Sequence, residues 1–146
     1  MPAAVNATAR KFGDPDNRIA QTDYWTVLLR PRQPTLGSLV LVCREDAKAF
    51  AEVSAAGFMD LGNVVRRVES TLRAVVAYER INYLMLMMVD PDVHFHVIPR
   101  YPGQREFAAT SFPDGGWPGP PQLEPAVVLD ASLRDALRAR LIEAWS

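Results

Sequence analysis

The amino-acid sequence predicts an α+β domain with a five-stranded antiparallel sheet, one long helix and a C-terminal helix. Five segments are rich in the branched, aromatic and other apolar residues that favour strands: 18–21, 24–30, 38–43, 83–89 and 94–100. The first three follow one another through short connections, whereas a parallel pair would need a crossover of a dozen or more residues. The last two are separated by a turn and read as a hairpin. Antiparallel pairing is therefore expected throughout.

Two helices complete this prediction. Over residues 60–80, apolar side chains recur at spacings of three and four, which is typical of a helix with one apolar stripe and one polar side. The stripe consists of Leu61, Val64, Val65, Val68, Leu72, Val75 and Val76. Over residues 130–145, leucines recur at four-residue intervals and Asp130 is placed to accept a hydrogen bond at the helix N-terminus. The arginines of the long helix are expected to form a solvated surface.

The chain is predicted to hold a single domain over residues 18–146, preceded by a loosely held, flexible arm over residues 1–17. The segment 99–125 contains seven of the twelve prolines and four of the eight glycines. Such a composition is typical of turns and irregular chain. Because the segment also carries Phe107, Phe112 and Trp117, we expect it to wrap over the domain without regular secondary structure.

Charge and composition exclude several classes of protein. With 16 basic and 17 acidic residues the formal charge is −1, so the basic excess needed to coat a nucleic acid polymer is missing. The longest apolar run, Tyr83–Val89, is far shorter than the roughly 20 residues that span a bilayer. A single cysteine, Cys43, and the lack of a signal-peptide core favour a reducing compartment, the cytoplasm. Neither a nucleic acid nor a membrane is expected as a partner.

The two histidines of the chain, His94 and His96, both belong to the last predicted strand. Side chains alternate along a strand, so the two imidazoles point to the same face with backbones about 7 Å apart. Asp92 precedes them and Arg100 follows them on this face. A random placement of two histidines would rarely give this pattern, which indicates a functional site.

Local chemistry alone leaves three interpretations open. An Asp-x-His-x-His row offers three metal-ligand types on one face, which suits zinc or another divalent ion. A neutral imidazole can instead attack phosphorus while its neighbour holds the phosphate oxygens. The third possibility is a pocket that holds an anion without catalysis. Spacing alone slightly favours a metal, although the sequence offers no further ligand cluster.

The segment DVHFHVIPRY, together with the antiparallel strands and the long helix before it, resembles the histidine triad family of nucleotide hydrolases and transferases. That family has the motif His-φ-His-φ-His-φ-φ, with φ apolar, and the resemblance covers roughly residues 18–101. It implies a five-stranded sheet with a long helix, a homodimer, and a nucleotide or dinucleotide substrate, such as a dinucleoside polyphosphate or a nucleoside phosphoramidate. No metal or other cofactor is implied.

By the same resemblance, His94 is the nucleophile that forms a covalent nucleotidyl-histidine, and His96 contacts the phosphate oxygens and the departing group. Arg100 is a candidate to pair with a phosphate, and Asn82 a candidate to reach the same cleft from the neighbouring strand. The alternatives are a nucleotide-binding protein with weak or no catalysis, and a metal-dependent hydrolase that uses Asp92, His94 and His96.

The sequence also departs from the family pattern. Asp92 stands at the first histidine of the motif, where we expect it to face the substrate site and to raise the pKa of His94, weakening the nucleophile. Arg30 stands where many relatives have an Asp or Asn that binds ribose hydroxyls, and an arginine cannot accept a hydrogen bond from a hydroxyl. Both departures bear on substrate choice.

Overall fold

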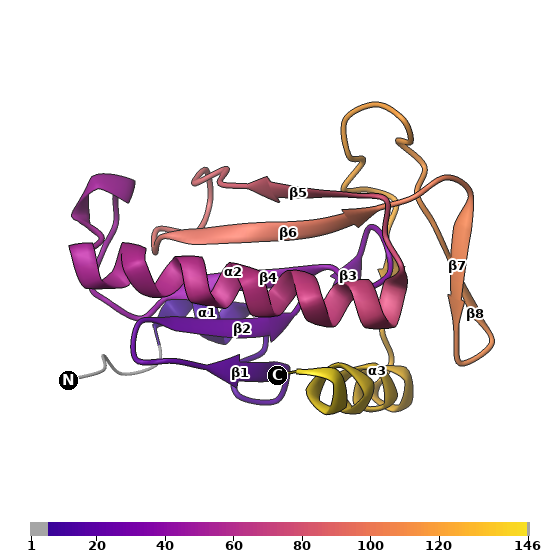
Figure 1. The fold of residues 1–146 in the computed structure, drawn as a ribbon, viewed down its shortest axis with the longest axis horizontal. Helices are drawn as coiled ribbons and strands as arrows, with labels where there is room; N and C mark the ends of the chain where they lie inside the picture. The colour runs from indigo at the N-terminus through magenta and orange to yellow at the C-terminus, as the bar shows by residue number, and fades with distance from the viewer. Residues whose placement is uncertain (1–5, 146) are drawn as a thin grey trace.

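The computed structural model describes residues 6–145 and contains the predicted five-stranded antiparallel sheet (Figure 1). Its strands run in the order β1-β2-β4-β6-β5, and each pairs antiparallel with its neighbours. Their bounds are Arg18–Gln21 for β1, Trp25–Leu29 for β2, Leu39–Cys43 for β4, Arg80–Leu84 for β5 and His94–Arg100 for β6. Two short strands, β3 (Arg32–Gln33) and β9 (Val127–Val128), form a separate pair. The predicted fold class is confirmed.

The long helix α2 spans Ala55–Val76 and lies across one face of the sheet (Figure 1). It begins five residues before the predicted start because the side chain of Ser54 accepts a hydrogen bond from the Gly57 amide and caps the helix. Its apolar stripe packs against the sheet, with Val64, Val68 and Leu72 fully buried. A short 3₁₀ turn at Phe50–Glu52 precedes it.

The C-terminal helix α3 spans Ala131–Ala144, and Asp130 caps it by accepting a hydrogen bond from the Leu133 amide, as predicted. Leu137 and Leu141 are buried in the same core as α2. Among the described residues, no helix is long and apolar enough to cross a membrane.

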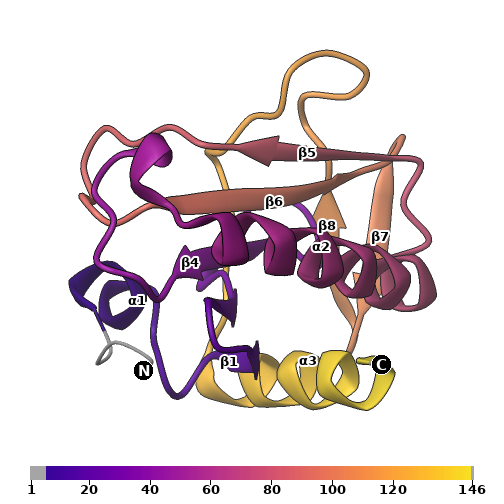
Figure 2. The ribbon, with the colours of Figure 1, turned by 60° about the vertical axis from the view of Figure 1, so that its left-hand side comes forward.

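The opposite face of the sheet is partly covered by a short helix, α1, at Ala7–Lys11 (Figure 2). Ala9 and Phe12 pack on Leu28, Val40 and Val42. Residues 6–17 therefore differ from the loosely held arm that we expected, because Ala9 and Phe12 pack against the sheet. The rest of the expected arm, residues 1–5, lies outside the described residues.

Two further expectations were wrong. The segment 99–125 does contain regular structure, a hairpin of β7 (Gln104–Phe107) and β8 (Thr110–Pro113), closed by Ala108 and Ala109, which both have positive φ. A pair of positive φ values is what a tight two-residue hairpin turn requires, and the sequence shows neither Gly nor Asn there to signal it.

The predicted strand 83–89 is shifted toward the N-terminus. β5 ends at Leu84, opposite His96, and residues 85–93 form a loop in which Leu86, Met88 and Val89 are exposed. We had read this methionine-rich run as a buried strand. The register of β5 is instead set by its ladder to β6, which begins with Arg80 opposite Arg100.

Candidate active site

The two histidines lie side by side near the start of β6, on the face of the sheet opposite α2. Their ring centroids are 5.2 Å apart. The ring of Phe12, which follows α1, lies 6.1 Å from His94 and 5.6 Å from His96, centroid to centroid. Under this cover only 2% of the His94 surface and 6% of the His96 surface are exposed. The two-residue period thus brings the pair together as predicted, and α1 shields it.

A main-chain contact sets the protonation of His94. Its Nδ1 lies 2.7 Å from the carbonyl oxygen of Asp92. A carbonyl can only accept a hydrogen bond, so Nδ1 carries the hydrogen, and in the neutral ring the lone pair is on Nε2. The local chain therefore presents His94 as the tautomer whose Nε2 can act as a nucleophile.

His96 has the opposite tautomer. Arg30 Nε donates to His96 Nδ1 over 3.4 Å, which makes Nδ1 the acceptor and leaves the hydrogen of the neutral ring on Nε2. Burial, together with the positive charge of Arg30, lowers the pKa of His96 to about 4. At neutral pH, His96 is therefore an uncharged hydrogen-bond donor beside His94.

The Nε2 atoms of both histidines remain available. Neither makes a hydrogen bond to a described residue. Within residues 6–145, Thr71 Oγ1 is the only fully buried side-chain nitrogen or oxygen without a partner. Each Nε2 is therefore the ring nitrogen without a hydrogen bond inside residues 6–145, although the rings as a whole are buried.

The carboxylate of Asp92 is directed toward α1 and the loop after β4. It accepts hydrogen bonds from the Thr8 amide (3.2 Å) and hydroxyl (2.8 Å) and from Lys48 Nζ. Burial alone would raise the pKa of Asp92, but these hydrogen bonds hold it below its ordinary value. The contact between Asp92 and His94 is made by the main chain, and Lys48 compensates the charge that we expected to act on His94.

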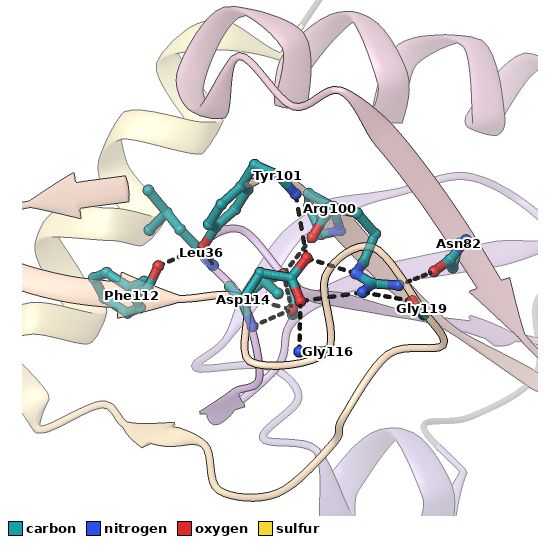
Figure 3. Close-up of polar contacts among 11 residues, drawn as sticks. Leu36, Asn82, Arg100, Tyr101, Phe112, Asp114, Gly116 and Gly119 are labelled. Carbon is teal, nitrogen blue, oxygen red and sulfur yellow. Dashed lines mark hydrogen bonds and ion pairs between the residues drawn. The ribbon is translucent and has the colours of Figure 1, made fainter. Parts of the chain in front are cut away.

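Arg100 and Asn82, the other predicted site residues, belong to a buried network at the far end of β6 (Figure 3). Arg100 Nε and Nη2 donate to the carboxylate of Asp114 over 2.7 and 3.1 Å, and Nη2 also donates to the carbonyl of Gly119. Its Nη1 donates to Oδ1 of Asn82. Only 3% of Arg100 is exposed. Arg100 shares the face of the histidines, but its donors hold the 114–119 loop against the sheet.

A groove of about 780 Å³ runs along β5, between that strand and the segment 117–121. Leu84 is paired with His96 and Asn82 with Ile98, and directly opposed residues of an antiparallel pair share a face. The lining of the groove therefore runs from Leu84, the residue paired with His96, to Arg100, and neither histidine is among the lining residues. Its wall includes the aromatic ring of Trp117.

Several residues at this site were not identified from the sequence. Phe12, Thr8 and Lys48 lie far from the histidines in the chain, and Trp117 lies in the segment that we expected to be irregular. An aromatic residue in a Pro- and Gly-rich segment was the one signal that could have marked Trp117. Among residues 6–145, no group of three or more His, Cys, Asp or Glu side chains is placed to hold a metal ion.

Solved structures with this fold include a histidine triad protein of Bradyrhizobium japonicum, with a TM-score of 0.75, 18% identity and 100% of each chain covered. A histidine triad protein of Sinorhizobium meliloti 1021 gives 0.74 at 22% identity, over 97% of this chain and 96% of that one. A hypothetical histidine triad nucleotide-binding protein of Sulfolobus tokodaii gives 0.70 at 16% identity, over 88% and 82%.

No curated protein matches the chain. The family model described as the HIT domain matches residues 12–103, a range that contains the whole five-stranded sheet, α2 and both histidines. This match covers more than half of the sequence, and the chain therefore belongs to the histidine triad family.

Proposed function

We propose that this protein is a nucleotide-phosphate hydrolase or nucleotidyl transferase that acts through a covalent nucleotidyl-histidine at His94. The observation that carries the proposal is the hydrogen bond from His94 Nδ1 to the Asp92 carbonyl. It places the lone pair on Nε2, which has no hydrogen-bond partner among the described residues. A free imidazole nitrogen beside a neutral donor is the arrangement that in-line attack on phosphorus requires.

In the first step, His94 Nε2 forms a bond to the substrate phosphorus, and the bond from phosphorus to the leaving oxygen or nitrogen breaks. The leaving group departs with that electron pair and takes a proton from water where it needs one. His96 Nε2–H donates a hydrogen bond to a phosphate oxygen and stabilises the charge that develops there. Water, or another acceptor, then attacks phosphorus. The bond from phosphorus to Nε2 breaks, its electron pair returns to Nε2, and the attacking group loses its proton to solvent.

The groove along β5 is the proposed site for the rest of the substrate. Asn82 and Trp117 line it, and an indole ring offers a surface on which a nucleobase can stack. The Sulfolobus tokodaii neighbour is described as nucleotide-binding, which supports a nucleotide as the ligand here. Dinucleoside polyphosphates and nucleoside phosphoramidates are the proposed substrate classes. In this proposal neither Asp92 nor Arg100 contacts the substrate. Asp92 orients His94 through its main-chain carbonyl, and Arg100 positions the loop that forms the groove wall.

We also propose that the protein is a homodimer of the cytoplasm. β5 is an edge strand of the sheet, and the loop after it exposes Leu86, Met88 and Val89. An edge strand next to exposed apolar side chains favours pairing with a second copy. Light scattering after gel filtration should give twice the chain mass, and Met88→Glu should reduce it, whereas a monomer at all concentrations would exclude the dimer. The buried free thiol of Cys43 suits a reducing compartment.

One observation favours a second candidate, a nucleotide-binding protein with weak or no catalysis. Phe12 and α1 leave only a few per cent of each histidine exposed, so a nucleotide phosphate can reach Nε2 only if α1 shifts. If it does not shift, the groove can bind a nucleotide without reaction.

Intact-mass measurement distinguishes these functions. The protein is incubated with a panel of dinucleoside polyphosphates and nucleoside phosphoramidates, then quenched, and the mass increase is assigned by peptide mapping. We expect a nucleotidyl adduct on His94, absent from His94→Asn, that also forms in excess EDTA. Binding without an adduct or turnover would support the second candidate. Turnover that EDTA abolishes and zinc restores would support the metal-dependent alternative.

A further inference from the structure

Arg30 is a partly buried cation that no carboxylate contacts. Its Nε donates to His96 Nδ1, and its Nη1 donates to the carbonyl of Arg32. Among residues 6–145, no Asp or Glu oxygen lies within 4 Å of its guanidinium, since the ion pairs of this part of the chain involve other cations. Burial lowers the pKa of Arg30 below its ordinary value, and the carboxylate of Glu124, which does not contact Arg30, opposes this shift only in part. The charge is therefore held in an unfavourable environment without a contacting counter-ion.

Two other cations of the protein, unlike Arg30, are paired with a carboxylate. Arg100 is bonded to Asp114 through two nitrogen atoms, and Lys48 is bonded to Asp92. A charge that is kept partly desolvated and unpaired costs free energy unless something compensates it. An anionic ligand would provide that compensation at Arg30.

The space for such a ligand is present. A hollow of about 200 Å³ is lined by Lys11, Phe12, Arg30, Pro31 and Arg32. A water molecule takes up about 30 Å³ of liquid volume, so this hollow has room for a phosphate group. The other two cations of its wall form ion pairs, Lys11 with Asp90 and Arg32 with Glu124. The side chains of Lys11 and Arg32 are at least half exposed. Exposed pairs of this kind are weak and can exchange partners.

The hollow and the reacting position lie on different sides of His96. Arg30 contacts Nδ1, whereas Nε2 is the free ring nitrogen proposed to face the phosphorus. β2, which ends next to Arg30, and β5, which forms the groove, also lie on opposite sides of β6 in the sheet. A group held by Arg30 is therefore a different group from the one that His94 attacks.

We propose that the hollow at Arg30 binds a second phosphate of the substrate, so that the preferred substrate is a nucleotide with at least one phosphate in addition to the one attacked by His94. This inference rests on the proposed function and names its substrate class. The second phosphate can belong to the ribose or to a polyphosphate chain. In both cases the planar guanidinium, with its remaining N–H groups, is the recognising element.

The kinetic test compares substrates that differ only in the second phosphate. Nucleoside 5′-phosphoramidates with and without a 2′- or 3′-phosphate form one pair, and dinucleoside polyphosphates of different chain length form the other. The measured quantity is the ratio of kcat/KM between the members of each pair. Wild type should prefer the more phosphorylated member, and Arg30→Gln should lower this ratio about 10- to 100-fold, as expected for loss of a charge-assisted hydrogen bond.

Matched variants sharpen the result. Arg30→Lys keeps the charge but not the fork, and should give an intermediate ratio. Arg138→Gln removes an arginine that donates to the Arg18 carbonyl, away from the hollow, and should leave the ratio unchanged. The pair whose ratio responds identifies whether the second phosphate is on ribose or in the chain. A ratio that Arg30→Gln leaves unchanged in both pairs would overturn the inference and leave the nucleophile assignment intact.

A binding measurement is independent of turnover. Inorganic pyrophosphate is titrated into ¹⁵N-histidine-labelled protein while the His96 ring signals are followed as a function of pH. The charged and titratable groups that act on His96 are Arg30, His94, Asp90 and Lys11. Neutralising Arg30 should make His96 easier to protonate, so pyrophosphate should raise its pKa in wild type and not in Arg30→Gln. This result would support the hollow even if no adduct forms. No response of wild type at millimolar pyrophosphate would overturn the inference.

Discussion

Strand β6 carries polar side chains on one face at both of its ends, and the two ends use their hydrogen-bonding groups differently. At the Arg100 end, Arg100 donates to Asp114, Asn82 and Gly119. At the other end, each histidine uses Nδ1 for a protein contact and keeps Nε2 free of described partners. A satisfied network fixes a loop, whereas a pair of free nitrogens can meet a ligand. This difference separates two groups of residues that the sequence had placed in one site.

The largest expected effect is on catalysis at the histidine end. His94→Ala should lower turnover by about three orders of magnitude or more, because it removes the attacking nitrogen. The melting temperature should change little in comparison, since the ring donates one hydrogen bond and its Nε2 makes none. Steady-state rates and thermal melts on the same preparations would test this. If His96→Ala lost activity and His94→Ala did not, the nucleophile would be the other histidine.

The Arg100 end should respond in stability. Asp114→Ala leaves the buried Arg100 cation without its counter-ion, which should cost about 3–5 kcal/mol of unfolding free energy in urea titration. The double variant Arg100→Met/Asp114→Leu should recover most of that loss, because no charge is then left buried. If Asp114→Ala instead kept its stability and lost activity, the Arg100 end of β6 would belong to the active site and not to a purely structural network.

A smaller effect is expected where α1 is held over the histidines. Thr8→Val removes the hydroxyl that donates to the buried Asp92 carboxylate and should cost about 1–2 kcal/mol. Hydrogen exchange of the α1 amides should accelerate in this variant. Lys11→Ala, which removes an exposed ion pair with Asp90 and a cation–π contact with Phe12, should change both measurements little. Equal effects of the two variants would show that the buried contact is not what holds α1.

An effect of similar size is expected in the pH dependence of stability, and it comes from His96. Its pKa is about 4 in the folded protein and near 6.5 when unperturbed, so the unfolded chain binds more protons between these values. Stability should be complete above pH 6.5 and fall as the pH drops toward 4, by about 1–2 kcal/mol after allowance for solvent screening. His96→Asn, which keeps an acceptor for Arg30, should flatten this part of the urea-derived stability profile. An unchanged slope would assign it to other groups.

Local periodicity was sufficient to predict much of this protein. The four-residue spacing of Val64, Val68 and Leu72 places them on one side of a helix, and Asp130 could be identified as a cap because its role depends on the next three residues only. His94 and His96 share a face because the strand period is two, whatever lies around them. Each of these properties depends on a few neighbouring residues and not on the path of the rest of the chain.

Local sequence patterns did not predict which distant segments pair with each other. The β5 register was misplaced because Met85–Val89 is as apolar as a buried strand, and only the ladder to β6 shows that it is a loop. The hairpin β7–β8 was missed because its turn uses two alanines. In both cases the deciding interaction is a pairing that a local pattern does not encode.

The fold class, the family resemblance and the histidine pair could be predicted from the amino-acid sequence, because each depends on local period and motif. The hydrogen bonding and burial of that pair could not. Thr8 and Asp92 meet across 84 positions, and Arg30 and His96 across 66. Such contacts depend on which strands are neighbours in the sheet and on how the N-terminal segment packs over it. The tautomer of His96, the shielding of both rings and the unpaired charge of Arg30 therefore follow from the assembled sheet.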